Sequence, residues 1–409
     1  MSNIAKKTLA NGVRILVEPV THVKSASVGL WCHTGSRHER PDEAGITHLI
    51  EHMLFKGTER RTSKELAEAI EGRGGSMNAF TDKEATCYYC RVLSDDIANG
   101  IDVLSDMMLH SVLDPEELAR EENVVLEEIK RSEDEPSDHV HELHVSRRWS
   151  ESAFGKPVLG TPESVAGFKR DDLQSYLARR YVGDNVLLAV AGNLDPAEVY
   201  AAAEETLGKL PSGGGDEELP RPKSTVDSLY VAKDVEQVHF CIGTNGVSLY
   251  DDELYTMAVL DAALGGSMSS RLFQEIREKR GLVYSVGSYG MNYTAGGLYT
   301  VYGGTGRENW NLVQELVAVE FAKVRSEGLA DEELQRTKRY LAGNLVLALE
   351  GMSSRMMRMS KNELNHRRDI PIEETLSRID GVTASAVATL AERLLDPAQV
   401  SITAIGPEA

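Results

Sequence analysis

Two histidines and a glutamate stand close together in the sequence His48-Leu-Ile-Glu51-His52. The segment from Pro41 to Gly57 is predicted to be a helix, because acidic residues come early and a glycine ends it. At about 100° per residue, the three polar side chains share one helix face, and apolar side chains occupy the other. Two histidines four residues apart can bind one metal ion, and the glutamate between them then lies beside it. The alternative is a surface helix that carries these residues by chance.

The order His-x-x-Glu-His is that of the inverted zincins, a class of zinc peptidases. Bound zinc lowers the pKa of its water to roughly 7, and a neighbouring carboxylate such as Glu51 can accept the proton. A catalytic zinc has three protein ligands and keeps one position open. A third ligand is therefore expected from another element.

A second acidic helix is predicted over residues 113–130, with Asp114 as its N-cap and Pro115 at its first position. Glu121 and Glu128 are seven residues apart, so they project from nearly the same face of this helix. Either glutamate could reach the metal, with the other supporting a ligand. Acidic helices are also commonly solvated, so the residues alone leave this choice open.

The elements that must position these residues occur twice. A strand at 26–35 precedes the candidate metal helix, and a strand at 238–243 precedes an apolar helix at 257–264. Each half also ends in an apolar strand closed by glycine, at Gly192 and at Gly406. Because the matching points lie about half a chain apart, the sequence predicts tandem copies.

The predicted fold class is α+β, with two tandem homologous domains, each a largely antiparallel sheet packed with helices. Asn11-Gly12 between two strand-like runs predicts a hairpin, and hence antiparallel pairing. We place the first domain at residues 1–212 and the second at 225–409. Residues 213–224, rich in glycine, proline and charge, are predicted to be the linker.

The second copy does not repeat the metal residues. Met257, Leu260 and Asp261 stand where the first copy has its two histidines and glutamate, so one zinc ion per chain is expected. The cluster His139-Val-His-Glu-Leu-His144 is interpreted as a surface helix rather than a second metal site, since nothing downstream completes a coordination shell.

With these motifs, the whole chain resembles the pitrilysin/insulinase metallopeptidases, most closely the mitochondrial-processing-peptidase-like branch. The family's signature is His-x-x-Glu-His followed, after a set interval, by a zinc-binding glutamate in a helix. The resemblance implies that His48, His52 and Glu128 bind zinc and that Glu51 is the catalytic base. It implies that Glu121 is a carboxylate that supports the zinc site.

The resemblance also implies residues that bind substrate. The glycine-rich segment at 72–81 is similar to the family's turn and edge strand, in which Asn78 and Ala79 match positions that contact the peptide. A later segment is similar to the one that supplies an arginine and a tyrosine, here Arg277 and Tyr284. In the family these bind the substrate carbonyl and help to stabilise the oxyanion. In isolation, such residues are equally typical of an ordinary protein surface.

Composition limits the classes of partner and the compartment. The formal net charge of −20 disfavours nucleic acid and anionic membranes. The sequence contains no apolar run long enough to span a membrane, and its N-terminus enters a strand-like pattern. Four cysteines are too few for a disulfide scaffold, so a cytoplasmic location is expected. Cys87 and Cys90 lie in a predicted strand, where they point to opposite faces and are interpreted as structural.

The expected function is that of a zinc-dependent endopeptidase acting on peptides or unfolded segments. The resemblance implies an enclosed chamber built from four domain copies, so two chains are expected to face each other. Because the metal residues and the Arg277–Tyr284 pair occur in one chain, a homodimer is favoured. The alternatives are the catalytic subunit of an obligate heterodimer and a non-catalytic core-type subunit, a class that has commonly lost its metal residues.

Overall fold

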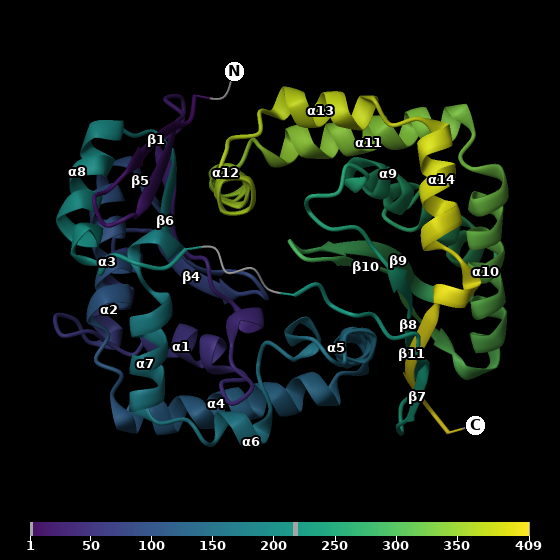
Figure 1. Ribbon diagram of the computed structural model, residues 1–409, viewed down its shortest axis with the longest axis horizontal. Coiled ribbons are helices and arrows are strands. Elements are labelled where there is room, and N and C mark those ends of the chain that lie inside the picture. Colours follow the sequence, from purple (N-terminus) through teal and green to yellow (C-terminus); the bar gives the residue numbers. More distant parts are fainter. Residues whose placement is uncertain (1–2, 216–219, 409) are drawn as a thin grey trace. The chain divides into compact units, whose positions relative to one another are not determined.

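The computed structural model describes residues 3–215 and 220–408, so part of the predicted linker, 216–219, lies outside the described residues (Figure 1). The described chain forms two compact units. The first unit draws on three stretches of the sequence, within 1–129, 156–218 and 348–371. The second unit draws on the remaining stretches, within 130–155, 219–347 and 372–409.

The first unit is built on a six-stranded sheet. Its strands, in spatial order, are β1 (Ala5–Thr8), β2 (Arg14–Pro19), β6 (Val186–Gly192), β3 (Ser25–Cys32), β5 (Thr86–Leu93) and β4 (Ser76–Thr81). Neighbouring strands are antiparallel, except that β2 and β6 are parallel. The hairpin predicted at Asn11-Gly12 joins β1 to β2, and Gly12 has a φ of 97°, which suits glycine. The predicted, largely antiparallel sheet is confirmed.

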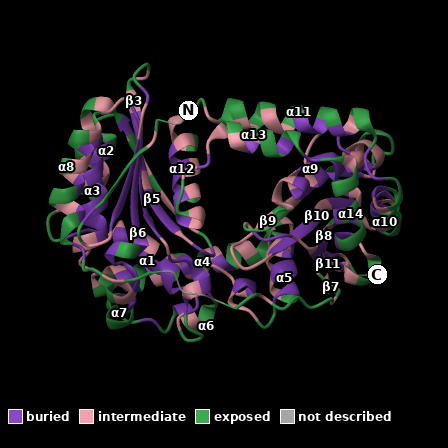
Figure 2. Cartoon of the chain, turned by 45° about the horizontal axis from the view of Figure 1, so that its top comes forward, coloured by how far each residue is buried: buried purple, intermediate pink, exposed green. Residues whose placement is uncertain are grey.

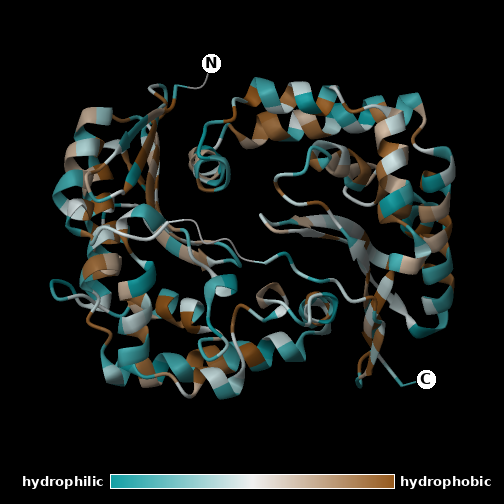
Figure 3. Cartoon of the chain, in the orientation of Figure 1, coloured by the Kyte–Doolittle hydropathy of each residue, from teal (hydrophilic) through white to brown (hydrophobic). Residues whose placement is uncertain are grey.

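Helices bury one face of this sheet in a continuous apolar core. They are α1 (Ile46–Leu54), α2 (Ser63–Glu71), α3 (Ile97–His110), α4 (Pro115–Asp134), α6 (Pro162–Val165), α7 (Arg170–Arg180) and α8 (Pro196–Thr206). The central strands β3 and β6 are almost entirely buried, and β6 is buried at every residue (Figure 2). The same strands are largely hydrophobic, whereas the helices beside them carry both hydrophobic and hydrophilic segments (Figure 3). This pattern is typical of amphipathic helices on a sheet.

The opposite face of the first sheet is covered by α12 (Met352–His366), a helix from the C-terminal part of the sequence (Figure 1). Met356 and Met359 of α12 pack with Trp31 of β3 and Leu187 of β6. Cys87 belongs to this cluster, whereas Cys90 belongs to the core on the other face. The prediction that Cys87 and Cys90 point to opposite faces is therefore confirmed, and the chain's cysteines are all free and buried.

The second unit is built on a five-stranded sheet, again antiparallel except for the pair β7–β11. In spatial order its strands are β7 (Leu229–Ala232), β11 (Ser401–Gly406), β8 (Gln237–Asn245), β10 (Gly297–Gly306) and β9 (Val283–Asn292). The helices of this unit are α5 (Pro136–Arg148), α9 (Leu254–Leu264), the π-helix η6 (Phe273–Glu278), α10 (Trp310–Glu327), α11 (Asp331–Ala348), α13 (Ile372–Asp380) and α14 (Ala384–Leu394).

The helix α5 packs against β8 and β11 of the second sheet. The expectation of a surface helix is wrong for His144, which is 1% exposed and lies 3.1 Å (Nδ1) from Thr403 Oγ1. His141 Nδ1 lies 2.7 Å from the hydroxyl of Tyr289. His141 and His144 therefore lie on the side of α5 that packs against the strands, where they contact polar groups of the second sheet.

Each unit contains one helix that comes from the other half of the sequence. The helix α5 belongs to the second unit and α12 to the first, although each lies in the opposite half of the chain. The predicted bounds 1–212 and 225–409 describe the repeat in the sequence, and they stay a prediction. Within the described ranges 3–215 and 220–408, no helix is long and apolar enough to cross a membrane.

Candidate metal centre

The helix α1 carries the candidate metal residues on its polar face. It begins at Ile46, later than the predicted start near Pro41, because Gly45 has a φ of 90° and ends the preceding turn. A Cβ atom on Gly45 would lie 2.6 Å from the carbonyl oxygen of Leu159, so the tight approach there also requires glycine. The opposite face of α1 is fully buried in the core, and its residues include Leu49, Ile50 and Met53.

A buried glutamate holds the first turn of α1. Glu39 is 7% exposed and accepts hydrogen bonds from the backbone N–H groups of Gly45 at 2.9 Å and Thr47 at 3.0 Å. Burial raises the pKa of Glu39 to about 7, although these hydrogen bonds oppose the shift. Glu39 therefore supplies the N-terminal acceptor that the helix lacks locally. It was not predicted from the sequence, since it precedes the helix by several residues and matches no capping motif.

Three ligand atoms converge between α1 and α4. Glu128 Oε2 lies 3.8 Å from His48 Nε2 and 3.7 Å from His52 Nε2, and the three residues offer ligand atoms within 4.8 Å of one another. These separations are too long for hydrogen bonds but suit donors that surround an ion at about 2.0–2.2 Å each. His48, His52 and Glu128 therefore fit a zinc ion. They are the one such group among the described residues.

The helix α4 carries both Glu121 and Glu128. It begins at Pro115, and Asp114 Oδ1 accepts hydrogen bonds from the N–H groups of Glu116 and Glu117. Glu128 reaches the Nε2 side of both histidines. Glu121 instead lies behind His52, with its Oε2 atom 3.0 Å from Nδ1.

The surroundings of the two histidines differ. Burial, assisted by the nearby charge of His52, lowers the pKa of His48 to about 4, so its imidazole is neutral at pH 7 and can donate a lone pair. His48 Nδ1 is buried and has no hydrogen-bond partner among the described residues. His52 is oriented by Glu121, which is 7% exposed in its side chain and also pairs with Lys56 Nζ at 2.6 Å. Lys56 was not predicted from the sequence.

Glu51 is held at the same site by the edge strand β4. The Thr81 hydroxyl donates a hydrogen bond of 2.5 Å to Glu51 Oε2. Burial raises the pKa of Glu51 above its ordinary value, while the Thr81 hydrogen bond opposes this shift. Among the described strands, β4 pairs with β5 alone, so its other edge is unpaired. Asn78 and Ala79 lie on this strand, and Ala79 N–H donates to Asn78 Oδ1 at 2.8 Å.

The second unit brings Arg277 and Tyr284 together. Arg277 Nε donates to the carbonyl oxygen of Tyr284 at 2.8 Å, and its guanidinium lies over the Phe273 ring and beside the carboxylate of Glu278. The Tyr284 side chain is exposed. Both residues are therefore accessible at the surface of their own unit.

The helix α9 has a different chemistry from α1. Met257 and Leu260 are buried in the apolar core, and Asp261 accepts a hydrogen bond of 2.5 Å from the Ser288 hydroxyl. Burial raises the pKa of Asp261 to about 6. No metal-binding group is formed here by the described residues.

Comparison with known proteins identifies the family. The family described as "Insulinase (Peptidase family M16)" matches residues 14–162, and "Peptidase M16 inactive domain" matches residues 167–341. An uncharacterized zinc protease of Bacillus subtilis is 40% identical over 391 residues, covering 96% of this chain and 95% of that protein. An uncharacterized zinc protease of Streptomyces coelicolor is 38% identical over 415 residues, covering 100% of this chain and 90% of that protein.

Solved structures share the fold. A peptidase M16 inactive domain from Pseudomonas fluorescens has a TM-score of 0.93 at 21% identity, covering 100% of this chain and 99% of that one. A protease from Helicobacter pylori has a TM-score of 0.93 at 19% identity, with 100% of both chains covered. The narrower resemblance to the mitochondrial-processing-peptidase-like branch stays a prediction. Together, the family matches and the full-length relatives show that the chain belongs to the insulinase family, peptidase family M16.

Proposed function

We propose that the protein is a zinc-dependent endopeptidase that binds one zinc ion through His48, His52 and Glu128, with Glu51 as general base. The observation that carries this proposal is the convergence of three ligand atoms within 4.8 Å, beside the partly buried Glu51, which shares the helix α1 with both histidines. The zinc protease names of the full-length relatives support the same cofactor and activity.

Zinc bound at this site would polarise the scissile carbonyl and lower the pKa of the attacking water. Glu51 accepts the proton of that water and returns it to the leaving amine. The hydrogen bond from Thr81 orients the Glu51 carboxylate during both transfers. Glu121 fixes the ring of His52 through Nδ1, so that Nε2 points to the ligand side.

The substrates we propose are peptides and unfolded polypeptide segments. An extended backbone can pair with the unpaired edge of β4, beside Asn78 and Ala79, by β-augmentation. This mode requires the substrate to be unfolded over the paired residues. Arg277 and Tyr284 are proposed to bind the substrate carbonyl and to stabilise the oxyanion.

The direct test is hydrolysis of a quenched peptide library by the purified chain alone, with zinc content measured in parallel. We expect turnover that a chelator removes and zinc restores. Activity only after addition of a second, different subunit would favour the obligate heterodimer. Stoichiometric zinc without any hydrolysis, with or without partners, would favour the non-catalytic core-type subunit and refute the proposal.

We further propose a homodimer with an enclosed chamber, in which Arg277 and Tyr284 of one chain serve the metal site of the other. The test mixes two inactive variants, Glu51→Gln and the double variant Arg277→Ala/Tyr284→Phe. In a two-fold dimer each mixed pair keeps one intact site, so subunit exchange restores up to about a quarter of wild-type activity. No recovery despite demonstrated exchange contradicts action between chains. We also propose a cytoplasmic location, which the free, buried cysteines support.

A further inference from the structure

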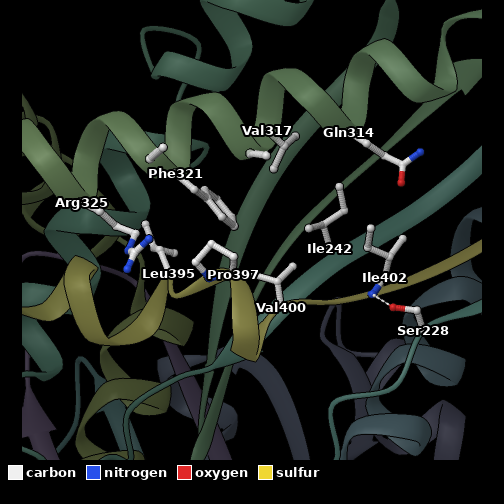
Figure 4. Close-up of a pocket in the computed structure, with 12 residues that line it drawn as sticks. Ser228, Ile242, Gln314, Val317, Phe321, Arg325, Leu395, Pro397, Val400 and Ile402 are labelled. Carbon is white, nitrogen blue, oxygen red and sulfur yellow. Dashed lines mark hydrogen bonds between the residues drawn. The ribbon is translucent and has the colours of Figure 1, made fainter.

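The second unit contains a cavity of about 250 Å³, and none of the metal residues lines it (Figure 4). One wall is a stripe of α10, with lining residues at every third or fourth position from Gln314 to Arg325. The opposite wall is formed by the chain between Leu395 and Ile402 and by Ile242 of β8. The cavity therefore lies between a helix and the sheet that this helix covers.

The interior of this cavity is apolar. Phe321 and Leu395 are buried, at 4% and 0% exposure, whereas Val400 and Ile402 are partly exposed. The small side chain of Ala322 on α10 leaves room between the helix and the strand end. The Ser228 hydroxyl, at the rim, already accepts a hydrogen bond of 3.0 Å from the N–H of Ile402 (Figure 4). An apolar group bound here would be removed from water, and it would displace few hydrogen bonds of the cavity walls.

Arg325 gives the cavity a charge at one end. Its Nε atom is buried and has no hydrogen-bond partner among the described residues. No carboxylate among the same residues forms an ion pair with the Arg325 guanidinium. Figure 4 shows the guanidinium beside Leu395 and Pro397. By contrast, Arg271 in the same unit pairs with Glu333 through two hydrogen bonds of 2.8 and 2.7 Å. A ligand carboxylate would match the fork of the Arg325 guanidinium and neutralise its charge.

The other end of the cavity carries no charge. Gln314 is neutral, and its side-chain amide reaches the carbonyl oxygen of Trp310 at 3.5 Å. A ligand with one anionic end and one apolar end therefore fits the distribution of charge. A cavity of roughly 150 Å³ accommodates benzene, so the volume here suits about ten non-hydrogen atoms.

We propose that this cavity binds a medium-chain aliphatic monocarboxylate, with the carboxylate on Arg325 and the alkyl chain between α10 and the end of β11. Octanoate has the matching size and is the probe we would use. The proposal does not depend on peptidase activity, because none of the lining residues belongs to the metal centre.

The test is calorimetric titration of the full-length, zinc-loaded protein with octanoate. We expect one site per chain, and binding at least ~10-fold weaker for octanol, which lacks the charge, and for acetate, which lacks the alkyl chain. Arg325→Gln should weaken octanoate binding by at least ~10-fold, since the charged hydrogen bonds are lost. Arg336→Gln is the matched control, because this substitution removes the same charge from an exposed position on α11.

Two further variants make the test decisive. Ala322→Phe fills the cavity from an exposed helix position and should abolish binding, and circular dichroism checks that the variant is folded. If it does not fold, Ala318→Leu takes its place. His48→Ala should leave octanoate binding unchanged, which separates this site from carboxylate binding to zinc. The proposal is overturned if octanoate fails to bind at millimolar concentration, or if Arg325→Gln and the cavity-filling variant both bind it normally. Binding only of an apolar peptide with a free C-terminal carboxylate would also overturn it.

Discussion

The pairing of His52 with Glu121 leads to a quantitative prediction about metal affinity. Glu121 places one carboxylate oxygen 3.0 Å from His52 Nδ1 and the other 2.6 Å from Lys56 Nζ, and its side chain is 7% exposed. The change Glu121→Gln keeps the shape of the side chain and a possible acceptor for His52, but it removes the negative charge. Because Lys56 keeps its charge, an unpaired ammonium group then lies close to the metal ligands.

The expected loss follows from these contacts. A hydrogen bond to a charged partner contributes about 1.5–3 kcal/mol, compared with about 1 kcal/mol for a neutral one. The carboxylate makes two such contacts, but one of them, to Lys56, affects the metal indirectly. We therefore expect Glu121→Gln to weaken zinc binding by about 10–100-fold, or about 1.4–2.8 kcal/mol. The double variant Glu121→Gln/Lys56→Met should recover part of this loss, since it removes the unpaired ammonium group as well.

The measurement is competition for zinc against a chromophoric chelator at fixed pH and ionic strength. Glu116→Gln on the same helix is the matched control, because the Glu116 side chain is 85% exposed and its carboxylate pairs with Arg120 at 3.5 Å, away from the metal ligands. This control should leave the Kd of zinc unchanged. Complete loss of zinc in Glu121→Gln would mean that Glu121 is itself a ligand. An unchanged Kd, or a double variant weaker than Glu121→Gln, would refute the role assigned to the charge.

Three other predictions concern the catalytic base, the start of α1 and the pH dependence of stability. Glu51→Gln should retain zinc and lose hydrolysis; loss of the metal, or normal turnover, would contradict proton transfer by Glu51. Glu39→Ala should lower the free energy of unfolding by about 1–3 kcal/mol in urea titrations, and Glu39→Gln by less, because two buried N–H groups lose their acceptor. Asp261 has a folded-state pKa of about 6, above its ordinary 3.8, so the folded state keeps a proton that the unfolded chain releases. Stability should therefore fall by about 3 kcal/mol as pH rises from about 4 to 6 and should then level off, and Asp261→Asn should remove this contribution. Urea titrations of the metal-free protein measure the difference, and equal pH slopes for both proteins would contradict the assignment.

Features with a local periodicity could be predicted from the sequence. The spacing of His48, Glu51 and His52 follows from a single helix, and Asp114-Pro115 marks the start of α4. The hairpin at Asn11-Gly12 and the alternation of Cys87 and Cys90 also depend on neighbouring residues alone. In each case local backbone geometry fixes the relation between the residues, so the feature can be predicted without knowledge of the tertiary fold.

Contacts between distant segments could not be predicted in this way. Glu39, Lys56 and Thr81 act on the metal helix or its partners through tertiary contacts, and no local pattern in the sequence indicates those partners. The burial of α5 was missed because its histidines and charged residues indicate a solvated helix. Polar side chains at a buried interface can be distinguished from solvated ones only when their partners, such as Thr403 for His144, are known.

The exchange of α5 and α12 has a consequence for biosynthesis. The face of the first sheet that carries Trp31 and Leu187 is covered by α12, which is translated long after those strands. A nascent chain that has completed residues 1–212 would therefore leave that apolar face open until α12, which ends at His366, has emerged from the ribosome. Such an exposed sheet is prone to association, so chaperone binding is expected to be most important during this interval. For the same reason, a protein cut between its sequence repeats would yield two fragments that aggregate separately and regain solubility only when they are refolded together.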